Sequence, residues 1–140
     1  LMTSTGMGRT WVYARLHAAW LDVTAGGVVY GTCSAACTTL EGWSRTVVEY
    51  IASDASLFGF DYPSLALGPN GLELAYQTVE TGLLRGASCA SDCSTTSGWT
   101  TFTVSLHGSG DRMTSLKVDP TGKRHLAWTD GGGGLRYTQY

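Results

Sequence analysis

Residues 17–22 read HAAWLD, residues 73–78 read ELAYQT and residues 125–130 read HLAWTD. The first two segments lie 56 residues apart and the last two lie 52 apart. A second short run rich in strand formers follows each of them, at residues 28–31, 83–86 and 135–138. Repetition at a nearly constant period predicts a chain built from several copies of one structural unit.

Two of the copies continue into a shared pattern of cysteine and tryptophan. The pattern is Cys-x3-Cys-x5-Trp, and it comprises Cys33, Cys37 and Trp43 in the first copy and Cys89, Cys93 and Trp99 in the second. Coincidence does not place two cysteines and a tryptophan at the same offsets twice. The copies are therefore true repeats.

One repeat reads as four short strands, most clearly in the second copy. The expected strands are residues 64–67, residues 72–77, a third near residues 83–85, and residues 100–104. The turns GPNG (68–71) and DPTG (119–122) use proline to fix φ and glycine to accept positive φ. Four antiparallel strands in about 50 residues is the size of a propeller blade.

The sequence therefore predicts an all-β fold of four-stranded antiparallel propeller blades, about two and a half to three in this chain. We expect blade 1 over about 1–52, blade 2 over about 53–108, and an incomplete blade 3 over about 109–140. The 19 glycines and the abundant threonine and serine agree with strands separated by turns.

Composition argues against two classes of partner. The net charge is −2, the charged fraction is 14%, and no basic cluster is present, so a nucleic-acid surface is not expected. No apolar run approaches the roughly 20 residues of a membrane helix, so a membrane partner is not expected either.

Residues 63–76 (PSLALGPNGLELAY) and 114–128 (TSLKVDPTGKRHLAW) resemble a bacterial family of secreted propeller repeats of the form S-L-A-L-D-x-x-G-x-x-H-x-A-Y. That family is similar in shape to sialidase propellers. Residues 4–11 (STGMGRTW) are similar to the sialidase Asp-box S-x-D-x-G-x-T-W, but Gly6 stands where the motif has Asp. We prefer to interpret this segment as a distorted hairpin of the first blade.

Propellers typically close with 4–8 blades, and three open blades would leave two sheet faces uncovered. We favour completion of the ring by homo-oligomerisation, with a dimer giving six blades. The alternative is that the chain is a piece of a longer propeller.

The four cysteines allow two interpretations. Four thiolates suit zinc, but the usual spacing is Cys-x2-Cys, and the two pairs fall in equivalent loops of different blades. Local disulfides, Cys33–Cys37 and Cys89–Cys93, are favoured, and they predict a secreted or periplasmic protein.

Aromatic residues divide into repeated and unrepeated positions. Repeated positions indicate structural packing between blades, and they are Trp20, Trp43, Tyr76, Trp99 and Trp128. Unrepeated aromatics before the second blade and near the first are the better candidates for stacking on a ligand, and they are Tyr13, Phe58, Phe60 and Tyr62.

His17, Glu73 and His125 share one position of the repeat. Two histidines and a carboxylate make an open catalytic metal set, provided that a ring brings them together. The structural interpretation is a repeat preference for a residue that bonds nearby backbone. No cofactor is firmly predicted, and a divalent metal is the one that these residues would suit.

Three functions remain open at this stage. The favoured one is a secreted binding or scaffold module, with glycans as the ligand class. The alternative is a small metal-dependent hydrolase of esters or phosphoesters, with its site at the ring axis. The third is a purely structural part of a longer propeller. Fold alone does not choose among them.

Overall fold

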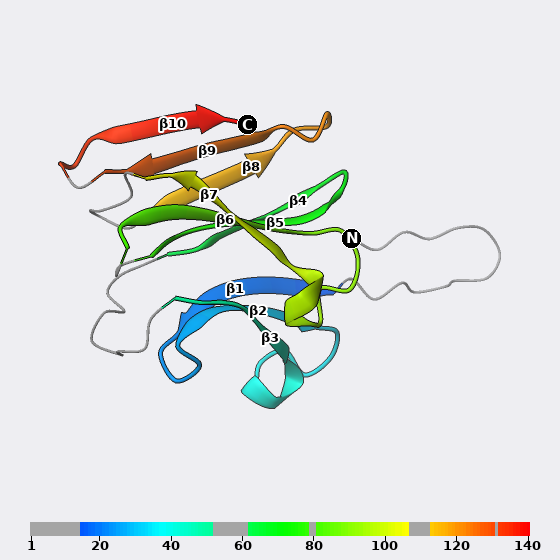
Figure 1. Ribbon diagram of the computed structural model, residues 1–140. Helices are drawn as coiled ribbons and strands as arrows, with labels where there is room; N and C mark the ends of the chain where they lie inside the picture. Colours follow the sequence, from blue (N-terminus) through cyan, green and yellow to red (C-terminus); the bar gives the residue numbers. More distant parts are fainter. Residues whose placement is uncertain (1–14, 52–61, 79–80, 107–112, 131) are drawn as a thin grey trace.

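The computed structural model describes residues 15–51, 62–78, 81–106, 113–130 and 132–140. In these residues the fold is all-β, as predicted, with three small antiparallel sheets and two short 3-10 turns, η1 (Leu40–Gly42) and η3 (Thr96–Gly98) (Figure 1). No helix in this part of the chain has the length and apolar character that crossing a membrane requires.

Each sheet follows the order of the chain. The first sheet contains β1 (Leu16–Asp22), β2 (Gly27–Cys33) and β3 (Ser44–Tyr50). The second contains β4 (Ser64–Gly68), β5 (Gly71–Thr78), β6 (Leu83–Cys89) and β7 (Thr100–Ser105). The third contains β8 (Thr114–Val118), β9 (Arg124–Thr129) and β10 (Leu135–Gln139).

The second sheet confirms the predicted four-stranded antiparallel unit. Its β4–β5 hairpin turns at residues 68–71 as expected, and Gly71 adopts a φ of +127° there. The third strand is longer than predicted, because β6 continues to Cys89 along the whole length of β5. The Asp-box-like segment, residues 4–11, lies outside the described residues.

The first two sheets share one register. Trp20 pairs with Val29 in the first sheet as Tyr76 pairs with Arg85 in the second. A β-bulge falls at the equivalent place in both, between Val28 and Val29 and between Leu84 and Arg85. The sequence repeat is therefore a structural repeat down to its irregularities.

The three sheets stack face to face, with the second in the middle (Figure 1). One buried cluster joins the first and second sheets through side chains such as Val28, Tyr30, Leu74 and Tyr76. Another joins the second and third sheets through Ala75, Leu84, Leu116, Leu126 and Trp128. Strand alternation supplies both clusters, because successive side chains of β5 point to opposite neighbours.

The first strands of the second and third sheets, β4 and β8, lie side by side. Tyr62 and Met113, just before them, form a parallel bridge. The Ser64 and Thr114 hydroxyls are 3.1 Å apart at the starts of the strands. At their ends, a Cβ built on Gly68 would lie 2.7 Å from a Val118 methyl, so the two strands run in the same direction.

Candidate functional site

Each sheet has a leading face, turned toward the preceding sheet along the chain, and a trailing face, turned toward the next. The leading face of the second sheet includes Leu72, Tyr76 and Trp99, which pack on the trailing face of the first. Tyr30 of that trailing face is 3% exposed, and its ring centroid is 5.2 Å from that of Trp99. Two faces have no neighbouring sheet in the described part of the chain: the leading face of the first sheet and the trailing face of the third.

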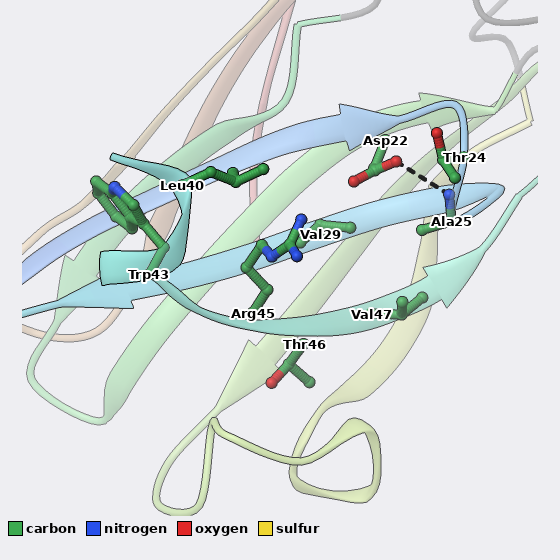
Figure 2. Close-up of a pocket in the computed structure, with 9 residues that line it drawn as sticks. All are labelled: Asp22, Thr24, Ala25, Val29, Leu40, Trp43, Arg45, Thr46 and Val47. Atoms are coloured by element: carbon green, nitrogen blue, oxygen red, sulfur yellow. Dashed lines mark hydrogen bonds between the residues drawn. The ribbon is translucent and has the colours of Figure 1, made fainter. Parts of the chain in front are cut away.

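The leading face of the first sheet is hollowed into an open pocket of about 680 Å³. Figure 2 shows Trp43 and Leu40 at one end, Asp22 and Thr24 at the other, and the Arg45 side chain lying over Val29 between them. Asp22 accepts a hydrogen bond from the Ala25 backbone N–H at 3.0 Å, which fixes the β1–β2 turn. The pocket therefore combines an apolar floor with one acidic and one basic side chain.

Two tryptophans dominate the apolar end of this face. The Trp20 and Trp43 rings meet edge to face, with centroids 6.4 Å apart. The Trp20 ring lies over Gly31, where an added Cβ would come within 2.6 Å of it. Glycine at this position therefore lets the Trp20 ring approach the backbone of β2 closely.

The trailing face of the third sheet is the second open surface. Leu135 is 78% exposed and Tyr137 is 61% exposed, although both lie on a strand next to the buried Leu126. The Tyr137 hydroxyl is 2.8 Å from His125 Nδ1, and the His125 Nε2 is 3.4 Å from the Asp119 carboxylate. Large apolar side chains on a sheet face are typical of an interaction surface.

Both cysteine pairs are disulfides, Cys33–Cys37 and Cys89–Cys93. In each loop the following tryptophan donates its indole N–H to the second cysteine's carbonyl, at 3.1 Å from Trp43 to Cys37 and 3.1 Å from Trp99 to Cys93. The residue before the tryptophan must be glycine, because the backbone of the loop passes close to it. A Cβ on Gly98 would lie 1.9 Å from the Asp92 carbonyl oxygen. The loops are thus rigid supports for the two tryptophans.

The structure separates His17, Glu73 and His125 onto three sheets. His17 Nδ1 lies 2.6 Å from the Tyr30 hydroxyl, and His125 makes the matching contact with Tyr137. Glu73 is instead buried in a two-point ion pair with Arg124, at 2.7 and 2.9 Å. No three His, Cys, Asp or Glu side chains gather as a metal site within the described residues.

A second ion pair lies between the first and second sheets. Arg85 contacts the Glu49 carboxylate at 2.6 and 3.2 Å, and the Tyr76 hydroxyl donates to the same carboxylate. The hydrogen bonds that Arg85 donates to the Glu49 carboxylate raise the pKa of Arg85. Burial, and then the Glu49 carboxylate, raise the pKa of Tyr76 well above its ordinary value of 10.0. These groups fix one sheet against the next and leave no free acid or base there.

The predicted aromatics fall in different places. Tyr76, Trp99 and Trp128 are buried between sheets, whereas Trp20 and Trp43 lie half-buried on the open leading face. Tyr62 is 53% exposed beside Met113. Tyr13, Phe58 and Phe60 lie outside the described residues.

Sequence reasoning missed Asp22, Arg45 and Tyr137. Asp22 and Arg45 come from different strands and share no motif. Tyr137 had a usable signal, since it lies 12 residues after His125 much as Tyr30 lies 13 after His17.

Comparison of the chain with protein-family models, with curated proteins and with solved structures finds no match in any of the three.

Proposed function

We propose that the protein is a β-propeller binding or scaffold module of an oxidising, extracytoplasmic compartment. Its three sheets are blades, related to secreted sialidase-like propeller repeats, and the ring is completed by further copies of the chain. The observation that carries this proposal is the repeated stacking of the sheets, which leaves one leading face and one trailing face open.

Strand order supports the blade assignment. Each sheet runs through space in chain order, as in the blades of a propeller. The neighbouring first strands β4 and β8 run side by side in one direction. That arrangement suits innermost strands around a common axis.

Ring completion explains the two open faces. Three blades are fewer than the 4–8 of known propellers, and two copies supply six. Light scattering coupled to size-exclusion chromatography tests this directly. We expect twice the 14.8 kDa of one chain. A monomer across the accessible concentration range would overturn self-assembly.

The compartment follows from the cysteines. Disulfides persist in oxidising compartments and are rare in the cytosol. Titration of the native protein with a thiol reagent should find no reactive cysteine. Four free thiols in native protein would overturn this part of the proposal.

Glycans are the ligand class we propose, bound between blades at the open leading face. Asp22, Thr24 and Arg45 supply hydrogen-bonding groups for hydroxyls at this pocket. A glycan array probed with the wild type and with Arg45→Ala tests this, with Arg136→Ala as a control that alters an exposed arginine on the third sheet. Silence of the wild type on the array, without a thermal shift from any sugar, would overturn the ligand class.

A further inference from the structure

The trailing face of the third sheet repeats that of the first sheet. His17 and Tyr30 stack with ring centroids 5.9 Å apart, and the rings of His125 and Tyr137 lie tilted against each other at 6.2 Å. In both pairs the tyrosine hydroxyl meets the histidine Nδ1. The two tyrosines occupy the same register position, because Tyr30 pairs with Ala19 and Tyr137 pairs with Ala127.

The two copies of this surface differ in what covers them. Trp99 and the rest of the second sheet's leading face cover Tyr30, which is 3% exposed. Tyr137 is 61% exposed, and no sheet in the described structure lies over it. The same His–Tyr surface is thus covered in the first sheet and exposed in the third. Its exposure to water costs free energy in proportion to the apolar area left exposed.

The chain also carries a second version of the covering surface. Trp43 lies 56 residues before Trp99, follows a disulfide loop of the same length, and makes the same indole hydrogen bond. Leu16 occupies the register position of Leu72, since they pair with Cys33 and Cys89. Leu72 is 7% exposed under the first sheet, whereas Leu16 is 54% exposed.

We propose that the leading face of the first sheet of one copy packs on the trailing face of the third sheet of a second copy, with Trp43 against Tyr137. The contact reproduces the packing of Trp99 on Tyr30. It rests on the proposed ring and names the residues that close it. A head-to-tail contact of this kind closes into a ring when the rotation between subunits allows it.

The contact between copies differs from the internal one at its edge. In the second sheet, Thr96 donates to the Val47 carbonyl of β3 at 2.7 Å, and Thr46 of β3 donates to the Ser94 carbonyl at 2.8 Å. Leu40 stands where Thr96 would be, and it is 58% exposed. Among the described residues, the third sheet has three strands, β8, β9 and β10. At this edge the contact between copies is therefore apolar, because Leu40 replaces the hydrogen-bonding Thr96.

Asp22 and Thr24 lie at the opposite end of the sheet from Trp43, because Asp22 pairs with Gly27 and Ser44, next to Trp43, pairs with Thr32. The contact therefore covers the tryptophan end of the pocket. The turn end stays at the margin of the interface.

Complementary variants test the head-to-tail geometry. Tyr137→Arg damages only the trailing face, and Leu16→Arg damages only the leading face. Both side chains are exposed, so the fold should tolerate either change, and circular dichroism with a thiol count checks this. Leu67→Arg is the matched control, since Leu67 is 75% exposed on the second sheet, away from both faces.

Each variant alone should be monomeric, with self-association weakened roughly 100-fold, as the loss of a buried anchor produces. An equimolar mixture of Tyr137→Arg and Leu16→Arg should regain a two-chain species, because one intact leading face meets one intact trailing face. The Leu67→Arg control should match the wild type.

The outcomes separate this inference from the proposed function. A wild type that is monomeric overturns self-assembly and the inference together. A dimeric wild type whose Tyr137→Arg and Leu16→Arg variants stay dimeric overturns the inference alone. Disruption by both variants without any recovery in the mixture also overturns it, because the mixed pair still offers one wild-type contact between an intact leading face and an intact trailing face.

Discussion

The contact between the first and second sheets and the contact between the second and third are built on one strand register but filled with different side chains. In the first contact, Tyr30 of β2 projects to the neighbouring sheet and lies opposite Thr46 on β3. In the second, the equivalent pair is Gly86 and Phe102. A Cβ on Gly86 would lie 2.5 Å from the Phe102 ring, so glycine makes room for the aromatic. Each contact therefore keeps one large aromatic ring but takes it from either of two paired strands.

The ion pairs between sheets do not occupy equivalent positions of the repeat. Glu49 and Arg85 link an outer strand to the next sheet's β6, whereas Glu73 and Arg124 link β5 to β9. Arg124 also lies over the Phe102 and Tyr140 rings, at 5.5 and 5.6 Å from their centroids. The backbone repeat thus fixes how sheets stack, and individual side chains decide how firmly each pair is held.

We expect the largest difference in unfolding free energy when the tryptophans that follow the two disulfide loops, Trp43 and Trp99, are replaced. Trp99→Ala should lose about 3–5 kcal/mol of unfolding free energy, because its ring is 6% exposed between two sheets. Trp43→Ala should lose less than about 2 kcal/mol in the monomer, since its face is open. Urea denaturation at a concentration where the chain is monomeric measures both. Equal losses would show that the two loops do not differ in packing.

The next largest difference in unfolding free energy should separate a buried ion pair, Glu73–Arg124, from an exposed one, Asp130–Arg136. Arg124→Leu leaves the Glu73 side chain, 8% exposed, without its partner, and should cost about 3 kcal/mol. Arg136→Leu removes a 63% exposed partner of Asp130 and should cost less than about 1 kcal/mol. The double variant Glu73→Leu with Arg124→Leu should recover most of the loss. A double variant as unstable as Arg124→Leu alone would contradict the role of the stranded charge.

The strands were predictable from the sequence because their signals are local. The turns at 68–71 and 119–122 mark their own hairpins, and the Cys-x3-Cys loops pair within themselves. Because the copies share a sequence pattern, the strands recognised in one copy predicted the strands of the others. Alignment of the three copies was enough to place every described strand of the second sheet.

The contacts between the faces of neighbouring sheets could not be predicted from the sequence in this way. Glu73 shares its repeat position with His17 and His125, which suggested a common role, but Arg124 approaches it from 51 residues away. Arg85 similarly meets Glu49 across 36 residues. Such pairings depend on how two sheets are rotated against each other, and no pattern within one repeat reports that rotation.

The two disulfide loops should differ in how much they stabilise the fold. Each closes a short loop, for which chain entropy gives about 2 kcal/mol. Cys89→Ser with Cys93→Ser should cost more than Cys33→Ser with Cys37→Ser. The second loop lies against the first sheet through the Ser94 carbonyl and the Thr96 hydroxyl. Thermal denaturation of both double variants measures the difference. Equal losses would indicate that these two hydrogen bonds contribute little.

The smallest effect concerns pH at the second contact. Burial raises the pKa of Tyr140 to about 12 from an ordinary 10.0. The folded state therefore favours the neutral phenol, so its contribution to stability is complete below pH 10 and is lost as the pH rises toward 12. Partial exposure limits this loss to about 1 kcal/mol or less.

Tyr140→Phe isolates that contribution, because phenylalanine keeps the ring against Phe102 and Arg124 but has no proton to lose. The Tyr140 hydroxyl is buried without a hydrogen-bond partner in the described structure, so the variant should be as stable as the wild type at pH 7. Melting temperatures of the two proteins should separate between pH 10 and 12, with the wild type falling faster. Parallel curves through this range would show that Tyr140 ionises without disturbing the contact, and that the stacking of the third sheet on the second does not depend on a neutral phenol.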